Sequence, residues 1–362
     1  MKLLFLCKRR PQGRDIFTQP FGRFYYLPKI LSEYGHEGYI LLLSYKNDPE
    51  SIRHEKKLTF HTISAHPWGP AKYLIQVNQI TRTFRPDWII GFSDIWYGIW
   101  AERISRSLGI NSLIDAYDNY ESYIPWAKPL HWIWRFALKR STALTAAGPE
   151  LAMLMSKGRE KKPATVIPMA ADPIFQPISD NNLRKQLDLP SNVPLIGYCG
   201  SLYKNRGLGT MFQALEHLLE DFPNAKLVIS GKREHGIDIP YNIQNAIISL
   251  GYLPDERMPL LLNALDVFLV INRDSVFGNF SYPVKLYEAM RCRRPVVASR
   301  TKSTSWILKD YPECLADPNN PADIAKCIKN ALSWKTKEYS SSNYDWEYSA
   351  SILNVLLEQE FV

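Results

Sequence analysis

Short apolar segments alternate with longer amphipathic segments along the whole sequence, and this alternation restricts the folds that the chain can adopt. In the first half the apolar segments cover residues 2–7, 38–44, 58–64, 87–93, 111–117, 143–148 and 164–168. Between them lie helical patterns such as residues 24–34, which stop at Gly35 as a helix with a C′ glycine does. Strands that alternate with helices are typical of βαβ units on a parallel sheet. The first half is therefore predicted to be a doubly wound α/β domain.

The alternation stops at residues 168–180, "PMAADPIFQPISD", and then starts again. This segment contains several prolines and has neither a helical nor a strand period, which indicates a linker. Further apolar segments follow at residues 194–201, 225–231, 245–253, 266–272 and 294–299. A chain of 362 residues also exceeds the size of one ordinary core. We therefore expect two tandem domains, 1–168 and 181–345, joined by a linker at 169–180. The ligand site is expected in a cleft where the carboxyl ends of both sets of strands face one ligand.

Charge and cysteine usage narrow the classes of partner. The formal charge of +8 and the pI near 9.1 favour an anionic partner. No zinc-finger, homeodomain or RNP pattern is visible, so we expect no nucleic acid but a phosphate-bearing substrate or an anionic lipid surface. The five cysteines are scattered without C-x-x-C spacing, which signals neither a zinc site nor a disulfide framework and fits a reducing cytoplasm. Residues 1–7 are followed at once by Lys8, Arg9 and Arg10, the reverse of a signal peptide's charge order, so we interpret them as a buried strand.

The segment "GYCGSLYKNRGLGTMFQAL" begins with a buried strand and turns at Gly200 and Ser201. It enters a helix near Gly207. Small residues let backbone N–H groups approach an anion, and Lys204 or Arg206 could add a charged contact to phosphate. The alternative is a βα turn with solvated basic residues.

The segment "GNFSYPVKLYEAMRCRRPVVAS" places Pro283 in the first turn of a predicted helix, where its missing N–H has no cost. Lys285 and Glu288 are three residues apart and share a helix face. An ionised Glu288 can only accept hydrogen bonds, which suits the hydroxyls of a ribose, whereas Lys285 and the N–H groups near Val284 suit a phosphate. The alternative is an ordinary Lys–Glu surface pair.

Acidic residues follow the carboxyl ends of two predicted strands in the first half. Asp94 follows one of them, and the group Asp115, Asp118 and Glu121 follows another. Asp118 or Asp94 could act as a base on an acceptor hydroxyl. The alternative for each is a strand-end aspartate that caps the next turn.

Residues 123–140, "YIPWAKPLHWIWRFALKR", combine Trp126, Trp132 and Trp134 with several basic residues. Tryptophan and cations on one amphipathic helix are typical of an interfacial membrane element. A helix buried against the sheet or lining the cleft is the alternative.

Taken together, these segments resemble the nucleotide-sugar glycosyltransferases of the GT-B fold, in the style of family four (glycosyl transferases group 1). The matching segments of the second half are "YCGSLYKNRGL", "LVISG", "GYLPDERMPLLLNALDVFLVIN", "SYPVKLYEAM" and "RRPVVAS", in the family's order and approximate spacing. The first half contributes "GRFYYLPKILSEYGHE", "RPDWIIGFSD", "GINSLIDAYDNYE", "AAGPELAMLMSKGR" and "ATVIPMAADPIFQP". The resemblance implies two Rossmann-like domains facing a central cleft. It also implies that a last helix at about 346–362 packs back on the first, acceptor-binding domain.

The resemblance assigns roles to residues of the donor-binding domain. It implies that Glu288 is the second glutamate of the family's E-x7-E motif and accepts from the donor ribose. Arg206 falls where the family places a lysine on the donor diphosphate. The turn at Gly200 and Ser201, together with the helix start at Pro283 and Val284, would cradle the phosphates through the backbone.

Three departures from the family pattern affect contacts to the sugar more than contacts to the diphosphate. Phe280 stands where the first glutamate of E-x7-E belongs, and Ser201 where many members carry a second phosphate-binding arginine. Tyr117 occupies the approximate place of a histidine credited with contacting the transferred sugar. Gly22 and Arg23 correspond to the glycine-containing loop that approaches the donor, a role for which Gly13 competes.

The resemblance implies a metal-independent, hexosyltransferase-like enzyme that moves a sugar from a nucleoside-diphosphate sugar to a glycan or lipid-linked acceptor. The expected pathway is polysaccharide or glycolipid assembly of the cell envelope, with retention at the sugar. We expect no cofactor and no metal. The expected location is the cytoplasm, with peripheral contact to the inner face of the membrane. The alternatives are a sugar-nucleotide epimerase of the same fold and a catalytically lapsed protein that binds glycans or anionic surfaces.

Overall fold

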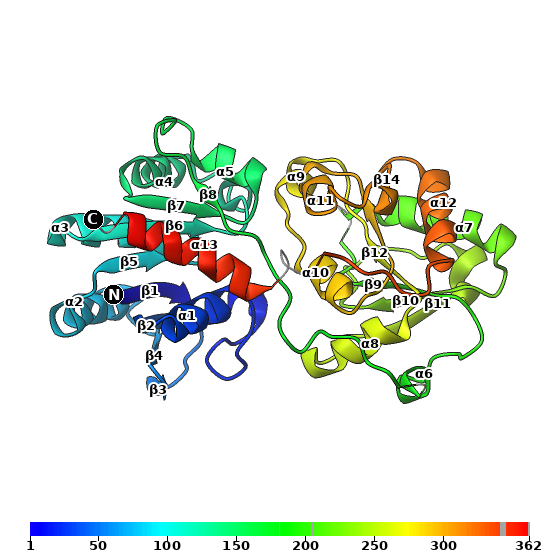
Figure 1. Ribbon diagram of the computed structural model, residues 1–362, viewed down its shortest axis with the longest axis horizontal. Helices are drawn as coiled ribbons and strands as arrows, with labels where there is room; N and C mark the ends of the chain where they lie inside the picture. The colour runs from blue at the N-terminus through cyan, green and yellow to red at the C-terminus, as the bar shows by residue number, and fades with distance from the viewer. Residues whose placement is uncertain (181, 204–205, 341–344, 361–362) are drawn as a thin grey trace. The chain divides into compact units, whose positions relative to one another are not determined.

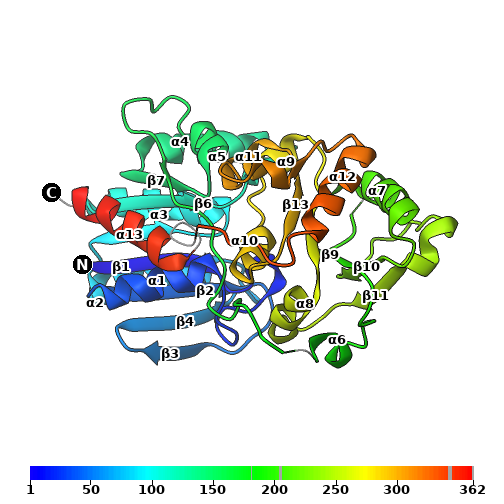
Figure 2. The same ribbon diagram turned by 45° about the vertical axis from the view of Figure 1, so that its right-hand side comes forward.

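The computed structural model describes residues 1–180, 182–203, 206–340 and 345–360. Its contacts divide the chain into two compact units: unit 1 comprises Met1–Ala170 and Asp345–Val362, and unit 2 comprises Ala171–Tyr344. Each unit is built on a sheet of its own that carries helices (Figure 1, Figure 2). The prediction of two doubly wound α/β units is confirmed.

Unit 1 is built on an eight-stranded sheet in the order β3-β4-β2-β1-β5-β6-β7-β8. Its strands are β1 Lys2–Lys8, β2 Glu37–Ser44, β3 Ser51–Glu55, β4 Leu58–Ser64, β5 Trp88–Gly91, β6 Asn111–Ala116, β7 Ala143–Ala146 and β8 Thr165–Val166. All neighbours pair in parallel except β3, which is antiparallel to β4 at the edge. The central strand β1 is buried on both faces, which explains why residues 3–7 form an unbroken apolar run.

The helices of unit 1 are α1 Arg23–Glu33, α2 Ala71–Phe84, α3 Ile95–Leu108, α4 Lys128–Arg140, α5 Pro149–Met155 and α13 Trp346–Gln359. Short 3-10 turns, η1 Pro11–Gly13 and η2 Tyr120–Ser122, follow β1 and β6. The C-terminal helix α13 lies along α1, where Trp346 stacks on Tyr26 with ring centroids 6.1 Å apart (Figure 1). On the other face, Val77 of α2 and Tyr97 of α3 pack on the apolar side chains of β1 and β2.

A pair of glycines sets the distance between β5 and α3. A Cβ on Gly91 would lie 2.5 Å from the Cα of Gly98. Gly98 in turn leaves room for Trp134 of α4, because a Cβ there would lie 2.5 Å from the indole ring. Unit 1 therefore stacks β5, α3 and α4 at close range.

Unit 2 contains a six-stranded, fully parallel sheet in the order β11-β10-β9-β12-β13-β14. The strands are β9 Leu195–Cys199, β10 Lys226–Ser230, β11 Ile247–Gly251, β12 Val267–Val270, β13 Val296–Ser299 and β14 Leu315–Ala316. The helices are α6 Leu183–Gln186, α7 Leu208–Asp221, α8 Met258–Ala264, α9 Val276–Phe280, α10 Val284–Arg291, α11 Lys302–Ile307 and α12 Pro321–Leu332. The short turns are η4 Tyr241–Ala246, η5 Asp255–Arg257 and η6 Pro312–Cys314. Helices α7 and α12 close one apolar core over the sheet.

The structure differs from the sequence-based expectation in a few elements. Strand β3 and the two-residue strand β14 were not predicted, since the first is polar and half exposed and the second is very short. The helix predicted within residues 123–140 begins only at Lys128, because Pro129 suits a first turn. Trp126 therefore lies before the helix. Pro283 is the N-cap of α10 and not its first helical residue. Among the helices in the described part of the chain, none is both long and apolar enough to cross a membrane.

Candidate functional site

The predicted donor-binding residues gather at the point where the strand order of unit 2 reverses. The chain leaves β9 toward β10 on one side, while β12 lies on the other side of β9. In open parallel sheets, ligands bind beyond the carboxyl ends of the strands at such a switch point. The segments that follow β9 and β12 meet there: Arg206 Nη1 donates to Asn272 Oδ1 at 3.1 Å, and the Arg206 guanidinium lies 4.4 Å from the centroid of the Phe277 ring. Arg206 is thus held at the switch point.

The turn after β9 is held close to the turn after β10. The Gly200 N–H donates to the Ser230 carbonyl at 2.8 Å, and the Leu202 N–H donates to the Lys232 carbonyl at 2.8 Å. A Cβ on Gly231 would lie 2.2 Å from the carbonyl oxygen of Gly200. Gly200 has a φ of 155° and is only partly exposed, like Ser201 beside it. The glycines therefore allow this backbone approach at the edge of the sheet. Lys204, a predicted phosphate contact, lies outside the described residues.

Helix α10 brings the predicted carboxylate and ammonium to the same place. Pro283 caps the helix with extended backbone, and Val284 is its first residue. Glu288 is only 7% exposed, which does not fit the alternative of a surface Lys–Glu pair. Burial raises the pKa of the Cys199 thiol, at the end of β9, to about 12; the nearby Lys285 ammonium lowers that pKa and the Glu288 carboxylate raises it. The side chains of Lys285 and Glu288 therefore both lie near the end of β9.

The chemistry of this cluster matches a sugar nucleotide's polar groups. A carboxylate accepts from hydroxyl groups, and a helix N-terminus with two cations attracts phosphate. Phe280 is the last residue of α9 and is partly exposed, so an aromatic side chain stands where the family pattern has a carboxylate. Asn272 and Phe277, which hold Arg206, were not singled out in the sequence. Their only signal was their position just after a buried strand.

Unit 1 has its own switch point, between β1 and β5. Ser93 follows β5 with a φ of 70°, a left-handed conformation that is strained for a non-glycine residue. Its Oγ accepts from the Lys8 backbone N–H at 3.0 Å, which ties the ends of the two strands together. Asp94 caps α3 by accepting from the Ile95 N–H at 2.8 Å, so the alternative of a capping aspartate is confirmed. Burial raises the pKa of Asp94, against the lowering effect of this hydrogen bond and of Lys8.

Tyr117 and Asp118 follow β6, and the Tyr117 hydroxyl lies close enough to Asp118 and Asp94 to be affected by their charges. Burial raises the pKa of Tyr117, and the carboxylates of Asp118 and Asp94 raise it further. A side-chain hydrogen bond from Gln12 lowers the same pKa. Asp118 accepts from the Asn119 N–H at 2.9 Å and from the Tyr123 hydroxyl. The predicted group Asp94, Tyr117 and Asp118 therefore comes together in unit 1. Gln12, on the left-handed turn η1, joins it without having been predicted.

Arg23 is buried in an ion pair inside unit 1 and is not part of a ligand site. Its guanidinium forms a two-pronged ion pair with Asp115, Nη2–Oδ1 2.6 Å and Nε–Oδ2 2.9 Å, and both side chains are 1% exposed. Nη1 donates to the carbonyls of Ile167 at 2.8 Å and Pro168 at 3.1 Å. Arg23 thus binds β6 to the segment after β8 inside unit 1, and the side chain is not available for the expected approach to a donor. Gly22, with a φ of 64°, supplies the left-handed turn before α1.

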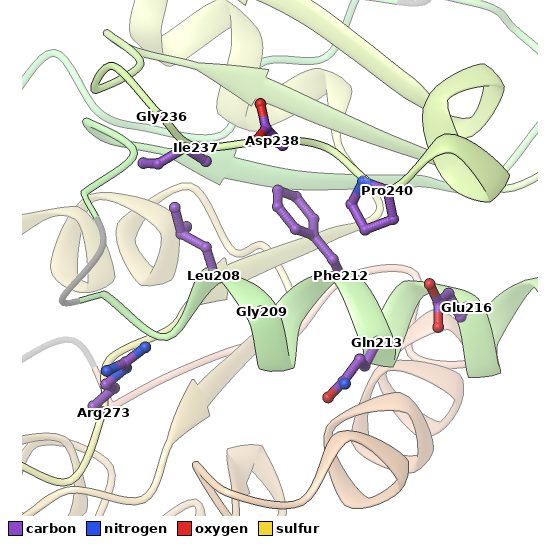
Figure 3. Close-up of a pocket in the computed structure, with 10 residues that line it drawn as sticks. All are labelled: Leu208, Gly209, Phe212, Gln213, Glu216, Gly236, Ile237, Asp238, Pro240 and Arg273. Atoms are coloured by element: carbon purple, nitrogen blue, oxygen red, sulfur yellow. The ribbon is translucent and has the colours of Figure 1, made fainter.

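A separate cavity of about 540 Å³ lies beside α7 in unit 2 (Figure 3). Figure 3 shows Leu208 and Phe212 of α7 directed toward the segment with Ile237 and Pro240. The remaining lining residues are Gly209, Gln213, Glu216, Gly236, Asp238 and Arg273. None of the predicted donor-binding residues that the structure describes lines this cavity, although Arg273 packs against Gly207 at its edge.

Among the residues that the structure describes, no group of three or more His, Cys, Asp or Glu side chains is arranged to hold a metal ion. The five cysteines are all buried and unpaired with one another.

Residues 179–344, which make up most of unit 2, match the family model described as Glycosyl transferases group 1. This part of the chain is similar to the group 1 glycosyl transferases. A curated relative of the chain is the 2-deoxystreptamine glucosyltransferase of Streptomyces kanamyceticus, 25% identical over 210 residues, which are 55% of this chain and 53% of that protein. The chain spans about half the length of the first curated relatives that it matches.

Solved structures extend the likeness to both units. The sucrose-phosphate synthase of Thermosynechococcus elongatus has a TM-score of 0.78 at 17% identity, over 99% of each chain. The Anabaena protein HepE, solved in complex with UDP, has a TM-score of 0.69 at 17% identity, over 100% of this chain and 96% of that one. At such identities the likeness shows the fold. The group 1 match and these structures together confirm the predicted resemblance to the GT-B glycosyltransferases.

Proposed function

We propose that the chain is a glycosyltransferase that moves a sugar from a nucleoside-diphosphate sugar to an acceptor bound by unit 1. The observation that carries the proposal is the meeting of α10 with the end of β9. There Glu288, which is only 7% exposed, and the Lys285 ammonium both shift the pKa of the Cys199 thiol at the switch point of the sheet. HepE, a protein of the same fold, was solved with UDP, which supports a uridine nucleotide as the first donor to test.

In the proposed reaction the donor-binding unit stabilises the departing diphosphate. Glu288 accepts hydrogen bonds from the ribose hydroxyls and so fixes the donor's position. Arg206, Lys285 and the N–H groups at the start of α10 neutralise the charge that develops on the phosphates as the glycosidic bond breaks. Two cations and a helix N-terminus supply this stabilisation in the proposal, so a divalent metal is not required.

Unit 1 supplies the acceptor side of the proposal. Asp94 and Asp118 are the candidates for a base that takes the proton from the acceptor hydroxyl, and its raised pKa makes Asp94 a stronger base than an ordinary aspartate. Tyr117 is proposed to contact the transferred sugar. The pathway is proposed to be polysaccharide or glycolipid assembly of the cell envelope, with retention at the sugar. The proposed location is the cytoplasm, at the inner face of the membrane.

The proposal is tested first by binding and then by turnover. In a thermal-shift panel of nucleotide sugars, the cognate donor is expected to raise the melting temperature, because a ligand of the native state stabilises it. Release of nucleoside diphosphate should then depend on an added acceptor and persist in the presence of a chelator. Nucleotide binding without transfer across an acceptor panel would instead support the lapsed binding protein, the candidate that Phe280 and Tyr117 favour. A panel in which nucleotide sugars leave the melting temperature unchanged contradicts both.

A further inference from the structure

Unit 1 carries a cluster of exposed aromatic and aliphatic side chains on α4 and the segment before it. We call this cluster the α4 face. Trp126 is 80% exposed and Trp132 is 69% exposed. The complete cluster is Tyr123, Trp126, Trp132, Ile133 and Phe136. Large apolar side chains that gather on one surface mark an interaction site more often than single exposed ones do.

The exposure of the α4 face does not result from a helix that failed to bury its apolar side. The opposite side of α4 is already packed: Trp134 and Leu138 are buried, and the Trp134 ring packs against Gly98. His131, also buried, donates a hydrogen bond from Nε2 to the Ile124 carbonyl at 3.0 Å. Helix α4 therefore has one apolar side for the core and a second one that faces solvent. The folding of unit 1 explains why the first side is apolar, but it does not explain the apolar side chains on the second side.

Basic residues surround the α4 face. Lys128, Lys139 and Arg140 are exposed on the helix itself. The segment after α5 adds the exposed Lys157 and Lys161, and it is held against the end of α4. Arg159 fixes this contact by donating to the carbonyl of Leu138 at 3.0 Å and to that of Thr142 at 2.8 Å. Two acidic residues lie among these basic ones: Glu121 is bound to Arg135 at 2.8 Å, and Glu160 is exposed between Lys157 and Lys161. The surface is therefore aromatic with a basic margin.

We propose that the α4 face docks unit 1 on a bilayer that contains anionic phospholipids. Tryptophan and phenylalanine side chains partition to the boundary between head groups and acyl chains, and lysines attract the lipid phosphates. A symmetric contact with a second copy would bring the basic margins of both copies together, which like charges oppose. A bilayer offers the apolar depth and the negative charge at the same surface. The face also adjoins the candidate site of unit 1, since its Tyr123 hydroxyl donates to Asp118.

The test is co-sedimentation of the full chain with vesicles, in the absence of donor and acceptor. Vesicles of phosphatidylcholine with phosphatidylglycerol are compared with vesicles of phosphatidylcholine alone. The wild-type chain is expected to bind the anionic vesicles and to lose this binding at high salt, where charges are screened. Because binding is measured without the reaction, its outcome does not depend on the proposed transferase activity.

Two double variants separate the contribution of the tryptophans to vesicle binding from that of the lysines. The double variant Trp126→Ser/Trp132→Ser should lower vesicle binding by at least about tenfold, since both rings would leave the interface. The double variant Lys128→Gln/Lys139→Gln should lower it by about 25-fold on anionic vesicles, at roughly fivefold for each lysine near the surface. Trp68→Ser is the matched control, because Trp68 is 78% exposed in unit 1 but lies before α2, away from the α4 face. The control should bind like the wild type.

Fluorescence quenching by brominated lipids and sedimentation without lipid are two further tests of the α4 face. Brominated lipids should quench part of the tryptophan fluorescence of the wild type, and the Trp126→Ser/Trp132→Ser variant should lose that part while keeping the wild-type melting temperature. Equal vesicle binding by this folded variant and the wild type would overturn the proposal. A dimer in lipid-free sedimentation that dissociates in the same variant would also overturn it, in favour of an interface between copies of the chain.

Discussion

The ion pair between Arg23 and Asp115 gives the clearest quantitative prediction for unit 1. Replacing Arg23 by Met removes four hydrogen bonds to oxygen atoms: two to the Asp115 carboxylate, at 2.6 and 2.9 Å, and two to backbone carbonyls, at 2.8 and 3.1 Å. Asp115 is then left buried, with the Thr145 hydroxyl at 2.6 Å as its remaining described donor. Breaking one partner of a buried ion pair costs about 3–5 kcal/mol, because the other charge stays without compensation.

Differential scanning calorimetry measures this cost, since the two units can unfold in separate transitions. For a unit of this size, 1 kcal/mol changes the melting temperature by about 2–4 °C, so Arg23→Met should lower the transition of unit 1 by roughly 6–20 °C. Arg103→Met is the matched control, because Arg103 is exposed on α3, and it should stay within about 0.5 kcal/mol of the wild type.

A second substitution tests the physical reason for the cost. Adding Asp115→Asn to Arg23→Met removes the uncompensated charge, so the double variant should be more stable than Arg23→Met alone. The nucleotide affinity of the chain should be unchanged in each folded variant. A melting temperature within 2 °C of the wild type together with weakened nucleotide binding would refute the reasoning, because that result fits the expected donor contact and not a buried structural pair.

Two aspartates of unit 1 should show opposite dependences of stability on pH. Hydrogen bonds from Arg10 lower the pKa of Asp48 to about 2, so the stabilising charge is complete above the unfolded pKa of about 3.9 and is lost as the pH falls toward 2. Asp48→Asn should therefore lower the unfolding free energy by about 1 kcal/mol at pH 7, after allowance for solvent screening, and by progressively less below pH 4. Burial raises the pKa of Asp94, so its charge destabilises the fold at neutral pH. Asp94→Asn, which keeps a capping side chain, should raise the unfolding free energy at pH 7, and the gain should vanish as the pH falls below the unfolded pKa of about 3.9, where the acid becomes protonated in both states. Denaturant titrations at several pH values measure both effects, and an effect of either variant that stays constant with pH would contradict the assignment.

The elements that the sequence predicts well are those that depend on neighbouring residues. A buried parallel strand needs an unbroken apolar run, so the strands around β1 and β9 are visible in the sequence. The stop of α1 at Gly35 is likewise local, since the residue has a φ of 106°. In the candidate donor site, the helix around Glu288 and the turn at Gly200 follow from spacing and composition alone.

The parts that the sequence does not predict depend on distant partners. Arg23 stands in a glycine-containing segment that suggests a ligand loop, but its carboxylate partner lies 92 residues away on β6. Arg206 is held by Asn272 and Phe277, and these two side chains come from the far side of the switch point. The tryptophans of residues 123–140 allowed two readings because each is correct for part of the segment: Trp134 enters the core, while Trp126 and Trp132 stay exposed.

The most direct test of the account is the binding of nucleoside diphosphates to wild type and Glu288→Gln, measured by isothermal titration calorimetry. The substitution keeps the shape of the buried side chain and removes its charge. Loss of hydrogen bonds to a charged acceptor is worth about 1.5–3 kcal/mol, so the affinity for UDP should fall roughly 10- to 150-fold. The exposed Glu256→Gln should bind like the wild type.

A ligand without ribose hydroxyls isolates the contact itself. The dideoxyribose analogue of UDP should bind wild type and Glu288→Gln with similar affinity, because the hydroxyls that Glu288 accepts from are absent. The account predicts a large effect of Glu288→Gln on UDP and almost none on the dideoxy analogue. UDP binding by Glu288→Gln that matches the wild type would contradict the assignment of this site to the donor.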